Sequence, residues 1–496
     1  GCAAGGRRNR PGAVSATPDV PAGTVAGLRA AVVGGGVSGL AAASALLRAG
    51  ADVVVLEQAD RCGGKVLGGE LDGLDLDLGA ESMLLRGRPR VAELLSRLGL
   101  DDRLTTPTAE RSALLADGRT VPVPPSLLGV PSDLEPLRGL LSEEGWRRAA
   151  EEPDRPFEVP AGDVAIGTLV ADRFGAEVAD RLLEPLLGGV YAGHSRELSA
   201  AAVNPRLWSA LRTGTSLLRT AAAMVPPPGT STGSPFTGLV GGVHQVVRAL
   251  VEELGERVRT GVTVRGLEPQ QHGWRLELAS RRHEDGAVRA DERADASEQL
   301  EVDAVVLAVP APAAARLLTG TAAAAPLEMI RYASPAVLAL HVSGVRPSGS
   351  GLLVPPGGLP TIKAITHSDR KWAWVAQRVQ EQWGEGHHLV RVSLGRAGEE
   401  AVLQRPDAEL AAATVAELRE LPRWDGVTVH GWRLQRWGGG LPQYAVGHLN
   451  RVEQVEQAVA GLPGLEVCGA AYRGVGVGPC LESGLEAADR VLAIAS

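Results

Sequence analysis

The sequence predicts an α/β protein in which one parallel sheet is built from separate pieces of the chain. Two observations carry this prediction. Near the start, a short apolar strand (28–33), an Ala- and Leu-rich helix (38–48) and a second apolar strand (52–56) form a β-α-β unit. Near the end, residues 465–492 again give a strand, a glycine-rich turn and a helix with one apolar face. We therefore expect a discontinuous Rossmann-like domain, accompanied by a mixed-sheet domain and a helical subdomain.

Between these ends, runs with helical spacing alternate with short apolar runs. The expected helices lie at 91–98, through most of 163–223, and at 244–255. The expected strands lie at 261–265, 302–309, 336–342, 361–366 and 388–394. The Pro-rich stretch 120–136 is expected to be a loop, and the highly charged stretch 280–300 a hairpin tip or an insertion.

These patterns divide the chain into six expected segments. A disordered tail (1–27) precedes three pieces of the cofactor domain, at 28–120, 236–318 and 441–496. A helical subdomain that faces substrate or membrane (121–235) and a substrate-binding sheet domain (319–440) lie between those pieces.

Composition narrows the possible functions. The 496 residues leave room for roughly three domain-sized units, and 44% hydrophobic with 22% charged residues exclude a wholly disordered chain. A net charge of −8 and 3% aromatic residues argue against a nucleic-acid partner, which needs basic patches and stacking surfaces. The uncharged run 30–47 contains three consecutive glycines, so we expect a strand, a turn and a buried helix there rather than a membrane span.

The four cysteines are Cys2, Cys62, Cys468 and Cys480. Their spacing matches neither a metal site nor a redox motif. We expect reduced thiols, no bound metal and a cytoplasmic protein that touches a membrane at most peripherally.

A glycine-rich turn follows the first strand and has the pattern G-x-G-x-x-G. It consists of Gly34, Gly35, Gly36, Val37, Ser38 and Gly39. In this pattern the first glycine permits a tight turn, the second lets the backbone approach a pyrophosphate, and the last permits close helix–strand packing. Glu57 lies 23 residues after Gly34, where a carboxylate accepts hydrogen bonds from a ribose diol. The pattern predicts a dinucleotide site but does not choose between NAD and FAD.

Two following stretches make that choice. Arg61, Cys62, Gly63, Gly64 and Lys65 extend the backbone platform and add positive charge for a diphosphate. Asp77-Leu78-Gly79-Ala80-Glu81-Ser82 then ends a short β segment. This succession resembles the flavin amine-oxidase superfamily and its R-x-G-G-[KR] motif. The resemblance implies a fold of the amine-oxidase and glutathione-reductase type and non-covalently bound FAD, with Gly79, Ala80, Glu81 and Ser82 running past the flavin ring.

The same resemblance implies cofactor contacts in two distant segments. Val262 would grip the adenine with its backbone. Gly469, Val475, Gly476 and Val477 would lie beside the flavin, where the start of the last helix points its N–H groups at the flavin pyrimidine.

Three stretches narrow the resemblance to the porphyrinogen oxidases of haem synthesis. They are 184–193 (EPLLGGVYAG), 238–243 (GLVGGV) and 441–448 (LPQYAVGH), of which the P-Q-Y-x-x-G-H string is the most specific. The chain is most similar to the soluble actinobacterial kind. This implies FAD-dependent, oxygen-using oxidation of coproporphyrinogen III to coproporphyrin III in haem b synthesis, in three two-electron rounds that each yield H2O2. Oxidation of protoporphyrinogen IX is the alternative.

The resemblance also implies residues for the substrate. Arg90 resembles a propionate-contacting arginine by its position after the Gly79–Ser82 stretch, with Arg86 and Arg88 as alternatives. Lys363 would hold a water near flavin N5 and is the candidate catalytic side chain, because the flavin itself carries the hydride transfer. Tyr444 and His448 would fix the domain junction near the flavin.

Other interpretations remain open. An amine oxidase usually needs an aromatic cage, and the chain has only four tyrosines. A carotenoid desaturase would favour a long apolar tunnel, and a flavin-binding scaffold would dock haem-pathway partners without catalysis. The expected partners are a porphyrinogen and O2, with transient contact to haem-pathway enzymes such as the ferrochelatase.

Overall fold

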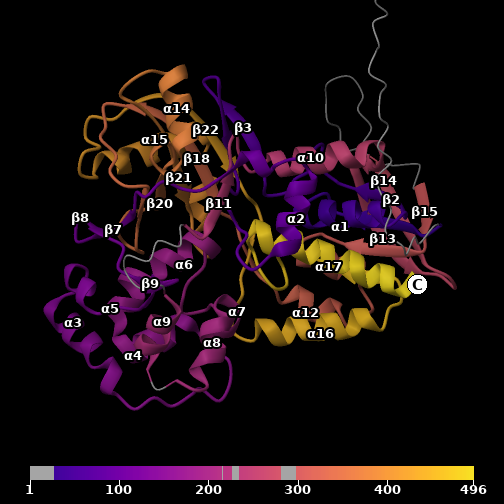
Figure 1. The fold of residues 1–496 in the computed structure, drawn as a ribbon, viewed down its shortest axis with the longest axis horizontal. Coiled ribbons are helices and arrows are strands. Elements are labelled where there is room, and N and C mark those ends of the chain that lie inside the picture. The colour runs from indigo at the N-terminus through magenta and orange to yellow at the C-terminus, as the bar shows by residue number, and fades with distance from the viewer. Residues whose placement is uncertain (1–26, 215, 226–233, 281–297, 496) are drawn as a thin grey trace, which may run out of the picture.

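The computed structural model describes residues 27–214, 216–225, 234–280 and 298–495. A five-stranded parallel sheet lies in the right half of the view in Figure 1. All its neighbouring strands run parallel, so widely separated parts of the chain meet in one sheet. In spatial order the strands are β12 (Val258–Arg259), β2 (Asp52–Leu56), β1 (Arg29–Val33), β16 (Ala304–Leu307) and β24 (Leu465–Val467).

Both faces of this sheet are covered, because successive side chains of a strand point to opposite faces. Ala30 and Val32 of β1 pack against one layer, and Ala31 and Val33 against the other. The first layer holds α1 (Val37–Arg48), α2 (Pro89–Arg97), α10 (Gln245–Leu254) and α17 (Val477–Ala495). The second holds α11 (Ala311–Leu317), α12 (Ala324–Glu328), α16 (His448–Ala460) and the antiparallel strands β13 (Val262–Pro269), β14 (Trp274–Ser280) and β15 (Glu298–Val302).

A second, seven-stranded sheet lies in the upper left of Figure 1. It is mixed, because β19 pairs in parallel with β7 and every other pair is antiparallel. Its spatial order is β22 (Thr428–Arg436), β18 (Ala336–Ser343), β21 (His387–Leu394), β20 (Ile362–His367), β19 (Gly351–Leu353), β7 (Ser112–Ala116) and β8 (Arg119–Pro122). One face packs on α15 (Asp407–Arg419). The other packs on α14 (Ala373–Gln382) and the hairpin β3 (Gly68–Leu71)–β4 (Leu74–Asp77), with α13 (Ser368–Lys371) beside it.

A helical region occupies the lower left of Figure 1 and has its own core. Its elements are α3 (Glu143–Ala150), α4 (Ile166–Phe174), α5 (Ala176–Val178), α6 (Glu184–Tyr191), α7 (Ala200–Val203), α8 (Pro205–Leu211), α9 (Leu217–Met224) and the hairpin β9 (Ser126–Leu127)–β10 (Val130–Pro131). Two small sheets complete the fold: β5 (Met83–Leu84), β11 (Phe236–Leu239) and β6 (Leu104–Thr105) form one, and β17 (Tyr332–Ala333) and β23 (Leu441–Pro442) the other.

A buried ion pair holds the helical region together. Glu152 is fully buried and pairs with Arg173 at 2.7 Å. Its carboxylate also accepts hydrogen bonds from the Ser216 hydroxyl (2.5 Å) and the Leu217 N–H (2.8 Å) at the start of α9. Taking a charged carboxylate out of water is costly, and here the ion pair and the hydrogen bonds to Glu152 offset that cost.

Most of the predicted elements are present. The β-α-β unit, the strands of the second sheet and the C-terminal strand–turn–helix lie where the patterns place them. The loop predicted for 120–136 is wrong in part, because the short strands β8, β9 and β10 lie in this stretch. Proline is tolerated here because Pro122 and Pro131 are the last residues of β8 and β10. The helical stretch 163–223 is broken into six α-helices, with a π-helical turn at Ala179–Leu183. Residues 1–26 and 281–297, which include the predicted tail and most of the charged insertion, lie outside the described residues.

Within the part of the chain that the structure describes, no helix is both long and apolar enough to cross a membrane. The six segment boundaries given above stay predictions.

Candidate active site

The glycine-rich turn joins β1 to α1, and its glycines differ in what surrounds them. Gly34 has a φ of 105°, and a Cβ there would lie 2.6 Å from the carbonyl oxygen of Ala308. A Cβ on Gly39 would lie 2.0 Å from the carbonyl oxygen of Gly34. Both positions therefore need glycine for close packing of helix on strand. At Gly36, by contrast, a Cβ would meet nothing within 4 Å. This open space is where a pyrophosphate could approach the backbone.

The start of α1 faces the same space. The helix begins at Val37, and its N-cap residue Gly36 supplies no side-chain hydrogen bond to the first turn. The side chains of Val37 and Ser38 are buried. The first-turn N–H groups carry the positive end of the helix dipole, so this end of α1 favours an anion.

Glu57 follows β2 directly and directs its carboxylate at the turn. Its Oε2 accepts a hydrogen bond from the N–H of Gly35 (2.7 Å), and its Oε1 accepts one from the N–H of Ala59 (2.8 Å). Each carboxylate oxygen can accept a second hydrogen bond. The backbone contacts thus orient Glu57 and leave it able to bind two vicinal hydroxyls, as predicted for a ribose.

The next loop packs on the turn through backbone contacts. Gly63 and Gly36 form an isolated parallel bridge, and the N–H of Gly63 donates to the carbonyl of Gly35 at 2.7 Å. Gly64 is exposed, has a φ of 55° and lies against Gly36. The second glycine pair therefore extends the wall of the open space beside Gly36.

The two cations of this loop are placed differently. The guanidinium of Arg61 folds back and donates to the carbonyl of Gly64 at 3.2 Å. Lys65 is half-buried, and burial lowers the pKa of its ammonium. The carbonyl of Lys65 accepts the N–H of Ala80 at 3.2 Å, and a Cβ on Gly79 would lie 1.9 Å from it. The Gly79–Ser82 stretch therefore lies directly against the loop, with Ser82 half-buried.

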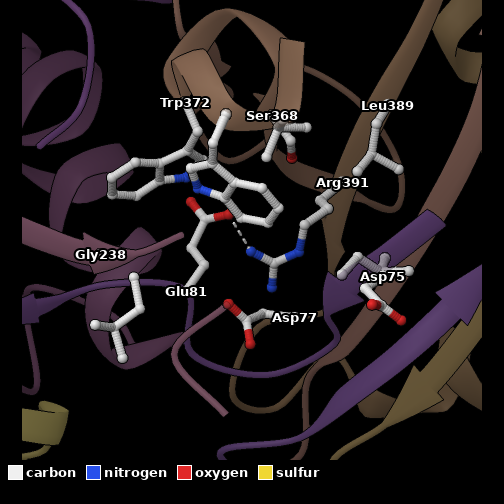
Figure 2. A pocket seen from close by; sticks show the side chains of 12 residues that line it. Asp75, Asp77, Glu81, Gly238, Ser368, Trp372, Leu389 and Arg391 are labelled. Atoms are coloured by element: carbon white, nitrogen blue, oxygen red, sulfur yellow. Dashed lines mark hydrogen bonds and ion pairs between the residues drawn. The ribbon is translucent and has the colours of Figure 1, made fainter. Parts of the chain in front are cut away.

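The side chain of Glu81 points to the seven-stranded sheet. Its carboxylate pairs with the ammonium of Lys371 at 2.5 Å. It also pairs with the guanidinium of Arg391, as Figure 2 shows. Burial alone raises the pKa of Glu81, but Lys371 and Arg391 lower it more, to about 2. Arg391 also donates to the carbonyl of Gly79. The Glu81 carboxylate is thus an ion-paired link between the two sheets, and the predicted cofactor contact remains only for its backbone.

The C-terminal segment completes the cradle. Gly469 has a φ of 119°, and a Cβ there would lie 3.8 Å from the hydroxyl of Ser38. A Cβ on Gly484 would lie 2.0 Å from the carbonyl oxygen of Ser38, so α17 lies in close contact with α1. Gly476 is exposed just before Val477 opens α17. The start of α1 therefore lies against α17, and Figure 1 shows the two helices side by side.

The P-Q-Y-x-x-G-H string joins this segment to the helical region. The hydroxyl of Tyr444 donates to the carbonyl of Ala470 and accepts from the N–H of Gly474, both at 2.7 Å. The ring of His448 stacks on Tyr444 with centroids 3.9 Å apart, and its Nε2 lies 2.9 Å from the carbonyl of Tyr472. Tyr444 and His448 therefore hold the segment 470–474, and their place near the flavin stays a prediction.

Two more contacts carry the string to α6. The side-chain amide of Gln443 donates to the carbonyl of Tyr191 at 2.8 Å, and the Tyr191 ring lies 5.5 Å from that of Tyr444. A Cβ on Gly193 would lie 2.0 Å from Oε1 of the Gln443 side chain. Two of the three stretches that resemble porphyrinogen oxidases therefore meet at one place. Val475 packs against the same helical core.

The third stretch that resembles the porphyrinogen oxidases, 238–243, leads into α10. Gly241 and Gly242 have φ of 91° and 103° and turn the chain into α10. The buried Asp77 accepts hydrogen bonds from the N–H of Val243 (2.8 Å) and of His244 (3.2 Å). This stretch thus supports α10 and the hairpin that ends at Asp77.

Lys363 lies buried at a bulge at the start of β20. Its Nζ lies 3.5 Å from the carbonyl of Gly188 on α6. Burial, together with the nearby guanidinium of Arg396, lowers the pKa of Lys363 to about 7. A Cβ on Gly188 would meet nothing within 4 Å. The amine can change charge near neutral pH; its place relative to the flavin stays a prediction.

The N–H of Val262 donates a hydrogen bond to the carbonyl oxygen of Glu57 at 2.9 Å. Adenine recognition through that N–H would therefore require this bond to be given up, and the adenine role of Val262 stays a prediction.

Two of the three candidate arginines contact α17, at different places along it. Arg90 is exposed and pairs with Asp489 at 2.8 Å, about 18 Å along the helix from Val477 at 1.5 Å per residue. Arg88 is half-buried, pairs with Glu482, and its side chain adjoins Gly478 in the first turn. Arg86 is exposed. The geometry therefore favours Arg88 over Arg90 for a ligand beside the start of α17.

Two cavities lie beside the Cys62 loop and Glu81. One, of about 20 Å³, lies between Glu81, Trp372 and Arg391 (Figure 2) and is large enough for a water molecule only. A wider groove of about 400 Å³ runs along Cys62, Gly68 and His244.

Sequence reasoning missed several charged residues at the junction. Lys371, Arg391 and Arg396 come from different elements, and no motif contains them. One signal was present: Arg391 stands in the apolar strand run LVRVSL, where a buried charge demands a partner.

Glu184 and His194 form a further pair, at 3.1 Å, in which hydrogen bonding to Glu184 raises the pKa of His194 to about 9.

Comparisons with known proteins agree with this geometry. The family described as "Flavin containing amine oxidoreductase" matches residues 37–492. A Coproporphyrinogen III oxidase of Mycobacterium bovis is 36% identical over 467 residues, which cover 91% of this chain and 94% of that protein. A Protoporphyrinogen oxidase of Bos taurus is 31% identical and covers 93% of this chain and 98% of its own. A solved structure from Exiguobacterium sp., provisionally assigned as a protoporphyrinogen oxidase, has a TM-score of 0.79 at 26% identity and covers 94% of this chain and 99% of its own.

Proposed function

The chain belongs to the flavin containing amine oxidoreductase family, and we propose that it is an FAD-dependent enzyme that oxidises coproporphyrinogen III to coproporphyrin III with O2 in haem biosynthesis. The observation that carries the proposal is the contact of Gln443 and Tyr444 with α6 and with residues 470–474. These contacts join the most specific sequence string to the segment that leads into α17. The relatives that match along most of the chain bear the corresponding names.

The residues around Gly36, Glu57 and the start of α17 fit FAD. Gly36 leaves room for a pyrophosphate, Glu57 for a ribose diol, and the start of α17 for the flavin end, which Gly469, Val475, Gly476 and Val477 would border. FAD supplies the hydride acceptor for this reaction, and the protein supplies binding, orientation and shielding.

The reaction removes six electrons from the tetrapyrrole, so three O2 are reduced to three H2O2. Each hydride leaves an sp³ meso carbon whose neighbouring pyrrole nitrogens stabilise the positive charge that develops. The chain therefore needs no strong acid or base at that carbon; it needs to hold the ring in an aligned pose.

An apolar macrocycle with carboxylates at its edge requires two kinds of surface. Leu84 and Phe236 are cross-strand partners with 41% and 43% exposure, and Leu84 lies against Gly478 at the start of α17. This apolar pair would face the ring, and Arg88 beside it would meet a propionate, because a carboxylate taken out of water needs a cation. Arg90 remains the alternative.

Lys363 would hold a water molecule close to the reacting atoms. Its buried amine lies 3.5 Å from the carbonyl of Gly188 and has a pKa of about 7, so it can donate to or accept from a water near neutral pH. The proposal also includes a cytoplasmic location, peripheral contact with a membrane at most, and transient contact with haem-pathway enzymes such as the ferrochelatase.

The test uses purified protein with a bound-flavin spectrum. Coproporphyrinogen III and protoporphyrinogen IX are added separately in air, and porphyrin fluorescence is followed against a blank without enzyme. A much faster rate with the four-propionate substrate supports the proposal. Faster oxidation of protoporphyrinogen IX would keep the chemistry and reassign the substrate, and blank rates for both would remove the porphyrinogen function.

A further inference from the structure

Three histidines meet on one face of the seven-stranded sheet. His341 comes from β18, His387 from β21 and His430 from β22. One ring nitrogen of each lies within 4.8 Å of the others, and the ring centroids are 4.7 to 5.0 Å apart. Adjacent strands therefore present three imidazoles to one point, and strands hold ligands more firmly than loops do.

A β-bulge brings the third histidine to this face. In the pairing of β18 with β22, His341 lies opposite Gly431 and the next residue, Val342, lies opposite Val429. His430 is thus the extra residue of the bulged strand. A bulge re-aims a side chain that regular alternation would send to the other face. The Nε2 of His430 lies 2.7 Å from the hydroxyl of Ser343.

Asp72 orients His341 from behind. Its Oδ2 lies 2.6 Å from Nδ1 of His341, which leaves Nε2 of that ring directed at His387 Nδ1, 2.8 Å away. Trp383 stacks on the His341 ring at 3.7 Å and donates its indole N–H to the Asp72 carbonyl at 3.0 Å. A carboxylate on the far nitrogen of a histidine is the usual outer contact of a metal ligand, because it fixes the ring and raises its basicity.

We propose that His341, His387 and His430 bind a divalent transition-metal ion of the Zn²⁺ class, with the fourth position open to water. Imidazole ligands suit Zn²⁺, and tetrahedral bonds of about 2.0–2.1 Å place ligand nitrogens about 3.3 Å apart. The observed separations, from 2.8 Å up to 4.8 Å, bracket that value. His430 is exposed and gives the ion a path from solvent, while His341 is buried.

The site is remote from the candidate active site. From His387 to Leu394, opposite the bulge that carries Lys363, β21 advances seven residues, which is about 23 Å. The ion would tie three strands together and, through Asp72, link them to the turn of the β3–β4 hairpin. Its role is therefore structural, and it does not rest on the proposed function.

The test uses the full-length, FAD-loaded protein without a polyhistidine tag, treated with chelator and dialysed. Zn²⁺ binding is measured by titration calorimetry, and Co²⁺ by the visible absorption of a tetrahedral complex. We expect one Zn²⁺ per chain, a tetrahedral Co²⁺ spectrum and a higher Tm with Zn²⁺ present. Asp72→Asn keeps all three ligands and should weaken Zn²⁺ binding about 10- to 100-fold. His387→Ala and His430→Ala each remove a ligand and should weaken it more.

His272→Ala is the matched control, because His272 is exposed on the turn between β14 and β13. It should bind Zn²⁺ like the unaltered protein. The proposal is overturned if no saturable binding is found, if the double variant H387A/H430A still binds one Zn²⁺ with unchanged affinity, or if His272→Ala loses binding equally. Far-UV circular dichroism of each variant separates loss of the site from loss of the fold.

Discussion

The hydroxyl of Tyr444 lies 2.7 Å from the carbonyl oxygen of Ala470 and donates a hydrogen bond to it. The same hydroxyl accepts the N–H of Gly474. One side chain therefore fixes both ends of the segment that leads into α17, and its ring packs between Tyr191 and His448. The position of residues 470–474 depends on this contact.

Tyr444→Phe should weaken FAD binding while the ring contacts remain. The change leaves the half-buried carbonyl of Ala470 and N–H of Gly474 without their partner, which costs about 1–3 kcal/mol of stability. FAD affinity is measured by flavin fluorescence during reconstitution. Tyr332→Phe is the control, since its hydroxyl accepts only the N–H of Ala311 at 2.9 Å. An equal loss of FAD affinity in both variants would show that the effect is general destabilisation.

Gly36→Ala should fold normally and lose FAD. Gly36 has a φ of −70°, and the added methyl group meets nothing within 4 Å, so the free protein has no strain to resist. The methyl group would occupy the space of the pyrophosphate. Tm without FAD and flavin content after reconstitution test this directly. Gly34→Ala should instead unfold more readily, because of its φ of 105° and its contact with Ala308. A Gly36→Ala protein that retains full flavin would refute this position for the pyrophosphate.

Arg88→Ala should raise the KM for coproporphyrinogen III about tenfold or more, because a propionate would lose its cation. Arg90→Ala, on the exposed part of the same helix, should leave KM nearly unchanged. Steady-state fluorescence assays at several substrate concentrations separate KM from kcat. The reverse pattern would restore Arg90 as the propionate ligand.

Lys363→Met should lower kcat and change the pH dependence of stability. The folded pKa is about 7 and the ordinary value 10.5, so between these values the unfolded chain binds more protons and this lysine makes stability rise with pH. The methionine variant lacks that rise. The free energy of unfolding of the methionine variant should exceed that of the unaltered protein most below pH 7, and the difference should shrink toward pH 10.5. Urea unfolding at several pH values measures the difference; parallel stability curves would contradict the burial of a titrating amine.

The local parts of the cofactor site could be predicted from sequence because their chemistry is encoded in neighbouring residues. Gly34, Gly36 and Gly39 lie within one turn, and Glu57 follows from the length of a β-α-β unit. Tyr444 could be singled out by its string, although the carbonyls it contacts could not.

The ion pairs across the junction could not be predicted, because they depend on how two sheets dock. Glu81 was expected beside the flavin, but its carboxylate meets Lys371 and Arg391, each about three hundred positions away in the chain. Whether Arg88 or Arg90 contacts a propionate depends on which turn of α17 each one faces. Their distance in sequence from the Gly79–Ser82 stretch does not reveal that turn.

The most direct test of the account is the ratio of H2O2 formed to coproporphyrin III formed by the FAD-loaded protein, measured together in one reaction against a blank. The account predicts porphyrin formation well above the blank, with three H2O2 for each coproporphyrin III. Porphyrin formation at the blank rate, or enzyme-dependent formation without H2O2, would contradict it.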